Sequence, residues 1–147
     1  MGYRFRLEAL KRYRHFQEET CQKEFADAQR LYEQEVRALA ALVELRSKTE
    51  AQMSREKHTK TTGAHMTMVT QYLERLARQI EERQREMRKA QKKCEKKRQG
   101  LIAAMQKRKT LEKLKAHGLS AYLQHLDHEE EKFISEMAIN RHILNTK

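Results

Sequence analysis

Proline and tryptophan are absent from this sequence of 147 residues, and glycine occurs only four times. Proline breaks helices and glycine weakens them, so few positions force a helix to end. No apolar run approaches the roughly 20 residues needed to span a bilayer, and residues 1–10 are basic and lack the apolar stretch of a signal peptide. These absences predict long helices without a membrane span or a secretion signal.

The chain also has little material for a globular core, with 38% hydrophobic and 36% charged residues. That supply suffices for one narrow seam between helices and falls short of a layered fold. An active site needs a concave pocket, which an extended helical protein does not readily supply. We therefore expect an all-α protein that is not an enzyme and uses no cofactor.

The strongest pattern is a seam in the second half of the chain, where spacings of three and four residues alternate without a break. Its members are Met66, Val69, Leu73, Leu76, Ile80, Arg83, Met87, Ala90, Cys94, Lys97, Leu101, Ala104, Arg108 and Leu111. Eleven of these fourteen are apolar, and a mean spacing of about 3.5 is the heptad period of a left-handed coiled coil. The flanking residues are mostly charged, so only this seam can be buried.

A looser apolar stripe in the first half of the chain predicts the partner helix. It comprises Tyr3, Leu7, Leu10, Cys21, Phe25, Ala28, Tyr32, Val36, Leu39, Leu42, Leu45 and Met53. Between the halves, the segment Lys57–Ala64 holds three threonines and Gly63, which suits a left-handed helix cap or a tight turn. So short a connection makes the two helices antiparallel neighbours.

The predicted fold is a single domain, a long antiparallel two-helix coiled-coil hairpin. Helix one is expected at about 3–56, the turn at about 57–64 and helix two at about 65–117, pairing residues whose numbers sum to roughly 122. Residues 119–145 keep an apolar stripe and form either a separate short helix, capped at His117–Gly118, or an overhang of helix two. A helix without an internal partner would be a docking element or a frayed tail.

Positive charge is concentrated in the stretch Arg83–Arg98, which holds nine Lys and Arg residues against two Glu. The predicted pairing places it opposite the acidic stretch Gln17–Glu35, and opposite flanking charges set the orientation of coiled coils. We interpret the stretch as an interhelical charge zipper. A nucleic-acid-binding surface along Arg83–Lys115 is the alternative, although that band has no aromatic side chain to stack on bases.

The open end of the hairpin is basic on both arms, with five Lys or Arg against one Glu in residues 1–14 and again in 105–118. Like charges placed together repel, so this end is expected to bind an acidic partner. A basic end that is merely solvated is the alternative. Its ten basic residues, called the basic tip below, are Arg4, Arg6, Lys11, Arg12, Arg14, Lys107, Arg108, Lys109, Lys113 and Lys115.

The remaining reactive side chains suggest no site. Cys21 and Cys94 are spaced neither as a metal site nor as an opposed pair, and we interpret them as small buried hydrophobes. His125 and His128 share a helical face near Asp127 and Glu129, yet a structural zinc ion normally needs four fixed ligands. No metal site is predicted.

Three segments resemble a known family in their order and spacing. They are the F-x-L-E-x-L start at Phe5–Leu10, the block RKTLEKLK at Arg108–Lys115 and the segment YLQHLDHEEEKFISEMAINR at Tyr122–Arg141. Together they resemble the flagellar export proteins of the FliJ family, whose members are short, basic, proline-poor helical hairpins. The resemblance runs nearly from end to end.

The resemblance implies a non-enzymatic, cytoplasmic component of the flagellar type III export apparatus, at the inner face of the cell membrane at the flagellar base. The family's hairpin is similar to the central stalk of rotary ATP synthases. It inserts into the hexameric ring of the export ATPase FliI, contacts the export gate protein FlhA and escorts export chaperones. The resemblance implies no binding of nucleic acid. It implies association with the membrane only through binding to the gate protein.

Two surfaces follow from the resemblance. The basic tip would bind the ATPase ring, and eight positions nearer the turn would bind the gate. This second set, called the gate face below, is Ala38, Leu42, Leu45, Thr49, Tyr72, Leu76, Gln79 and Arg83. Leu42 and Leu76 also fit the seam, and for Leu76 the seam is the better interpretation. The equivalent stalk protein of a virulence type III secretion system is a further alternative.

Overall fold

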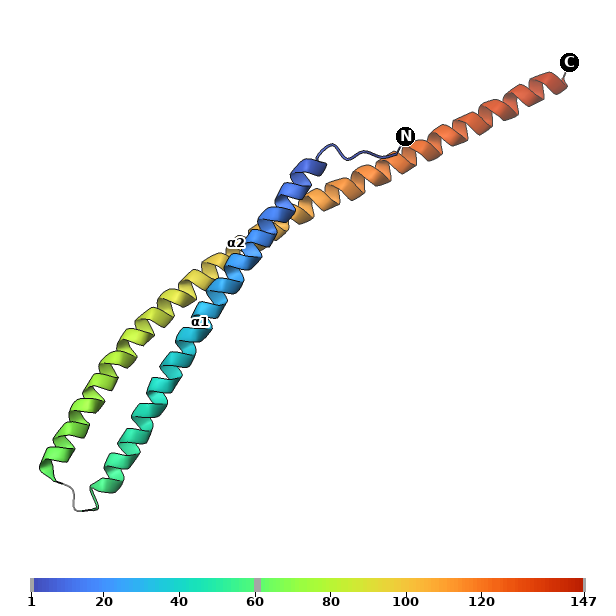
Figure 1. The fold of residues 1–147 in the computed structure, drawn as a ribbon. Helices are drawn as coiled ribbons and strands as arrows, with labels where there is room; N and C mark the ends of the chain where they lie inside the picture. The colour runs from blue at the N-terminus through green and yellow to red at the C-terminus, as the bar shows by residue number, and fades with distance from the viewer. Residues whose placement is uncertain (1, 60–61, 147) are drawn as a thin grey trace. The chain divides into compact units, whose positions relative to one another are not determined.

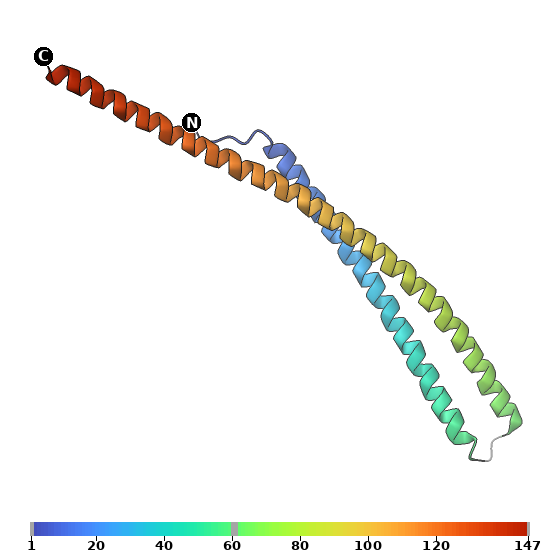
Figure 2. The ribbon, with the colours of Figure 1, turned by 180° about the vertical axis from the view of Figure 1, so that it is seen from behind.

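The protein folds into two long helices in a computed structural model that describes residues 2–59 and 62–146. Helix α1 spans Glu8–Glu56 and helix α2 spans Gly63–Asn145. They pack against each other as an antiparallel hairpin, which confirms the predicted fold (Figures 1 and 2). The chain divides into two compact units: unit 1 comprises the residues up to Glu18 and those from Ala103 onward, and unit 2 comprises Glu19–Ile102.

Unit 2 is held together by the predicted seam. Leu76 is 2% exposed and Ile80 4%, and Ala28 of α1 is 4% exposed. Every member of the series from Met66 to Leu101 is buried or half-buried except Arg83. The heptad period therefore located the buried face of α2 correctly.

The buried face of α1 differs from the predicted stripe. Leu7, Leu10, Val36 and Leu45 are 38%, 38%, 38% and 41% exposed, so including them was wrong. The inward face instead follows the same alternation of three and four residues, and about half of its positions are polar. Its buried and half-buried members are Lys11, Arg14, Glu18, Cys21, Phe25, Ala28, Tyr32, Glu35, Leu39, Leu42, Arg46, Thr49, Met53 and Glu56.

Ion pairs between the helices agree with the predicted register. In unit 2, Lys97 Nζ lies 2.9 Å from Glu24 Oε2, and Arg83 Nη1 lies 3.2 Å from Glu35 Oε2. These residue numbers sum to within a few of 122. The charge zipper is thinner than predicted, because three other cations of the Arg83–Arg98 stretch pair along α2 itself. Those pairs are Arg85 with Glu81, Lys89 with Glu86 and Arg98 with Glu95.

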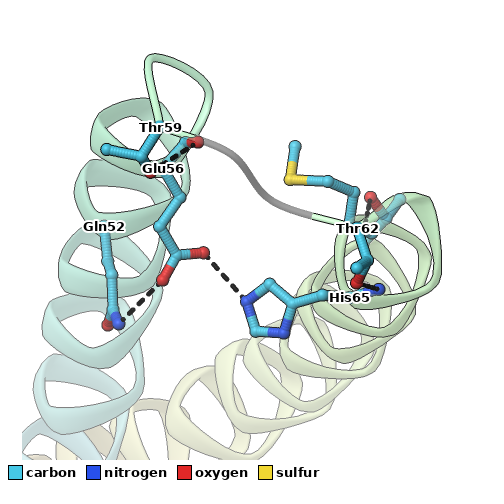
Figure 3. A network of polar contacts seen from close by, with 7 residues as sticks. Gln52, Glu56, Thr59, Thr62 and His65 are labelled. Carbon is cyan, nitrogen blue, oxygen red and sulfur yellow. Dashed lines mark hydrogen bonds and ion pairs between the residues drawn. The ribbon is translucent and has the colours of Figure 1, made fainter.

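Polar contacts join the helix ends beside the turn (Figure 3). The Glu56 carboxylate accepts a hydrogen bond from Gln52 Nε2 at 3.2 Å, and its other oxygen lies 2.9 Å from His65 Nε2. At the start of α2, the backbone N–H of His65 donates to the Thr62 hydroxyl at 3.4 Å, as in an N-cap. Gly63 is the first residue of α2 and has no positive φ, so its expected role as a left-handed cap or turn residue is wrong. Residues 60 and 61 of the predicted turn lie outside the described residues.

Unit 1 begins with a short non-helical segment on α2. Helix α1 starts at Glu8 rather than near Tyr3, after a turn in which the Glu8 N–H donates to the Phe5 carbonyl at 3.3 Å. The Tyr3 ring lies beside Tyr122 with 5.7 Å between centroids. Tyr3 also covers Gly118, where a β-carbon would collide with its phenol oxygen. Gly118 therefore provides a packing site in mid-helix, because it has no side chain.

Helix α2 continues through Gly118 to Asn145, so the overhang prediction holds and the separate C-terminal helix does not. Beyond Tyr122 every described residue is exposed. The structure thus leaves the apolar stripe of this C-terminal segment, residues 119–146, open to solvent except at Tyr122, which lies beside Tyr3.

Candidate functional site

The basic tip lies in unit 1, where some of its cations take part in the helix packing. The Glu18 side chain is buried, at 6% exposed, and accepts a hydrogen bond from Arg108 Nε. Arg108 Nη1 also donates to Glu112 at 2.8 Å. Hydrogen bonds to Glu112 and Glu18 raise the pKa of Arg108, so this guanidinium carries its charge at every relevant pH. Arg108 therefore fixes the pairing of α1 with α2.

A second link across unit 1 joins Lys115 to Glu8, with 2.9 Å between Nζ and Oε2. Lys11 Nζ lies 3.9 Å from the other Glu8 oxygen. The hydrogen bond from Lys115 lowers the pKa of Glu8, and the same bond raises the pKa of Lys115. Arg14 donates to Gln17 at 2.9 Å, with its guanidinium carbon 5.9 Å from the centre of the Tyr13 ring.

The basic tip thus splits into two groups. Lys11, Arg14, Arg108 and Lys115 are half-buried and engaged with neighbouring side chains. The other six are exposed and form no ion pair within the described residues. These outer cations are Arg4, Arg6, Arg12, Lys107, Lys109 and Lys113. The sequence shows which residues are charged but not which way their helix faces point, so it could not separate the two groups.

The Glu8–Lys115 link predicts a local response to acid. Because the folded pKa of Glu8 lies below its ordinary value of 4.5, the link stabilises unit 1 above that pH and is lost as pH falls through the folded pKa. The variant Glu8→Gln should show a few-fold faster amide exchange than wild type in residues 8–18 at pH 7. The difference should shrink as the pH falls below 4.5, once intrinsic rates are corrected, because protonation of Glu8 removes the link. A difference that does not depend on pH would contradict the assignment.

The gate face lies in unit 2, and only part of it is accessible. Leu76 is buried in the seam, so it can touch a partner only if the helices separate. Ala38, Leu42 and Thr49 are half-buried. The exposed members are Leu45, Tyr72, Gln79 and Arg83, and Arg83 already pairs with Glu35.

The C-terminal segment exposes many large apolar side chains, most of them on one face of α2. Its large apolar side chains are between 40% and 75% exposed, and they are Leu119, Leu123, Leu126, Phe133, Ile134, Met137, Ile139, Ile143 and Leu144. A shallow hollow there is lined by Phe133, Ile134 and Met137. Scattered exposed leucines are ordinary, but a row of this length marks an interaction surface.

Among the described residues, the structure does not support a site at the cysteines or the histidines. Cys21 and Cys94 are free and half-buried in unit 2. Within residues 2–59 and 62–146, no three His, Cys, Asp or Glu side chains are grouped as metal ligands. In the same residues, no helix has the length and apolar content needed to cross a membrane.

Comparison with known proteins decides the family. The family model described as "Flagellar FliJ protein" matches residues 3–147. The chain belongs to the FliJ family. No curated protein and no solved structure matches it. The family match covers nearly the whole chain, so the resemblance inferred from its three motifs is confirmed.

FliJ membership fixes the general role of the chain. It is a non-enzymatic component of the flagellar export apparatus, and its partners belong to that apparatus. The match is to a flagellar family, so the flagellar interpretation replaces the virulence-system alternative. Which partner binds which surface has to be argued from the surfaces themselves.

Proposed function

We propose that this FliJ protein acts as a stalk-like element that binds and stimulates the hexameric export ATPase FliI through the outer cations of the basic tip. The proposal rests on the two different roles that the residues of the basic tip play within unit 1. Arg108 and Lys115 link α2 to α1, while six others, the outer cations, stay exposed without ion pairs among the described residues: Arg4, Arg6, Arg12, Lys107, Lys109 and Lys113. A stiff basic element of this kind suits an acidic surface on a ring.

The C-terminal segment supports the same assignment. It continues α2 directly beyond the basic tip and exposes Phe133, Ile134 and Met137. A partner that takes the cations would cover this apolar row as well, and burying large apolar side chains supplies the affinity that exposed charges lack. We assign both surfaces to the ATPase ring.

The gate protein FlhA is proposed to bind the accessible part of the gate face on unit 2. Leu45 and Tyr72 supply apolar contact area, and Gln79 and Arg83 supply polar groups beside them. Leu76 supports this surface from inside the seam. Export chaperones are further partners, and the protein works at the cytoplasmic face of the membrane at the flagellar base.

Charge reversal at the basic tip tests the ATPase assignment. The variant Arg4→Glu, Arg12→Glu, Lys109→Glu, Lys113→Glu should need at least about a tenfold higher concentration for half-maximal stimulation of the cognate ATPase. Each lost charge contact weakens binding several-fold. Steady-state ATP hydrolysis against added protein measures this.

A control variant matches the change in net charge. Lys23→Glu, Arg30→Glu, Arg37→Glu, Lys48→Glu alters four exposed cations of unit 2 and should stimulate like wild type. Equal stimulation by the tip variant and wild type would overturn the assignment, and so would an equal loss in both variants.

A further inference from the structure

The basic stretch of α2 in unit 2 has more positive charge than the hairpin itself uses. Of its nine cations, only Arg83 and Lys97 pair with α1. Arg85, Lys89 and Arg98 pair with glutamates of α2. Within the described residues, the remaining four have no ion pair and are all exposed: Arg88, Lys92, Lys93 and Lys96.

The helical period sorts these charges onto faces. The seam side of this stretch is Met87, Ala90 and Cys94. Opposite it, a stripe of five basic residues shares the outer face with one acid, Glu95, which stands seven residues after Arg88 and so on the same side. This outer stripe consists of Arg85, Arg88, Lys89, Lys92 and Lys96.

Nearby glutamates pair with two members of the stripe, Arg85 and Lys89, and leave the other three without an ion pair within the described residues. Glu86 bonds Lys89 at 3.2 Å, and Glu95 accepts two hydrogen bonds from Arg98 at 3.0 and 2.8 Å. The bonds from Arg98 lower the pKa of Glu95, which shows how fully that carboxylate is engaged. The other helix of the unit carries Glu24, Asp27 and Glu33 along the same part of the hairpin. It also carries the exposed cations Lys23 and Arg30 there, so the charges of α1 are mixed and the excess of positive charge lies on α2.

We propose that the outer stripe of α2 binds the surface of an anionic lipid bilayer. A helix face whose charges are mostly positive lies on a plane of negative headgroups without inserting, because the stripe has no apolar or aromatic residue. Juxtaposed Lys and Arg side chains bind such surfaces through their charge alone and need no fixed geometry. Helix α1, whose charges in this part are mixed, then faces away from the membrane.

Nucleic acid fits the same stripe less well. The stripe offers no aromatic side chain for base stacking. None of its five members has a neutral polar side chain that could contact base edges. The proposed contact adds a direct lipid interaction to the protein partners of the apparatus and does not depend on the ATPase or gate assignments.

Vesicle co-flotation of the full chain tests the proposal, using phosphatidylcholine vesicles with about 30% phosphatidylglycerol at low and physiological salt. The variant Arg88→Gln, Lys92→Gln, Lys96→Gln should lower the partition coefficient by about two orders of magnitude at low salt, since each cation contributes about fivefold. Wild-type binding should fall steeply with salt and be absent on pure phosphatidylcholine.

The control variant Lys23→Gln, Arg37→Gln, Lys48→Gln removes the same charge from α1 and should retain most of the binding. Circular dichroism checks that each variant keeps its helices. Absent wild-type binding to anionic vesicles would overturn the proposal, as would equal losses in both variants or equal binding to neutral vesicles. A stripe variant that loses duplex DNA binding at physiological salt but keeps vesicle binding would make the stripe a nucleic-acid site instead.

Discussion

Replacing Leu76 by alanine should lower the free energy of unfolding by about 2–5 kcal/mol, the usual range for removing a buried leucine side chain. Leu76 is 2% exposed and lies next to Ile80 in the seam of unit 2. The hairpin has few buried apolar residues, so no second layer of side chains can fill the cavity that the substitution leaves. Urea unfolding followed by circular dichroism measures the loss.

The matched control is Leu31→Ala, on α1 of the same unit. Leu31 is 51% exposed, so its truncation should change the free energy of unfolding by no more than about 0.5 kcal/mol. A comparable loss in both variants would mean that Leu76 is not in the seam. The same two variants separate an effect on stability from an effect on binding to the gate protein, because Leu76 also belongs to the gate face.

Reversing the charge of Glu18 should lower the melting temperature by about 10 °C or more. The variant Glu18→Arg places a second guanidinium beside Arg108 at a site only 6% exposed in the wild type. Breaking a buried pair by changing one partner leaves an uncompensated charge and is strongly destabilising. Thermal unfolding followed at 222 nm measures the shift.

Exchanging the two charges tests whether the effect belongs to the pair. Glu18→Arg combined with Arg108→Glu should recover most of the lost melting temperature. Recovery will be incomplete because the new carboxylate at position 108 lies one turn from Glu112, which is the present partner of Arg108. Glu33→Arg, at an exposed site on α1, should shift the melting temperature by no more than about 2 °C. No recovery in the exchanged variant would show that the pair does not fix the pairing of the helices.

The fold could be predicted because the heptad period is strongest where the seam is apolar. The series through Leu73, Leu76 and Ile80 specified the buried face of α2, and the short connection then specified an antiparallel partner. In α1 the same period is present but polar residues occupy about half of it. Selecting apolar residues alone therefore chose Val36 and Leu45, while Glu35 and Arg46 lie on the inward face.

Sequence reasoning predicted the charge of the binding surfaces better than their accessibility. It could not distinguish Arg108, which bonds the buried Glu18, from Lys109, which is exposed, because that difference depends on helix orientation. Gly118 was predicted as a possible helix cap because glycine commonly ends helices. Its actual role depends on Tyr3, more than a hundred residues away, and local pattern carries no information on such a contact.

Double electron–electron resonance between spin labels at Glu24→Cys and Lys97→Cys, in a Cys21→Ser, Cys94→Ser background, tests the hairpin most directly. The two native side chains touch across the helices of unit 2. The doubly labelled chain, diluted with an excess of unlabelled protein, should give a narrow and short distance that dilution does not change. A broad, long distribution, or a short distance that disappears on dilution, would mean that the two helices do not pair within one chain.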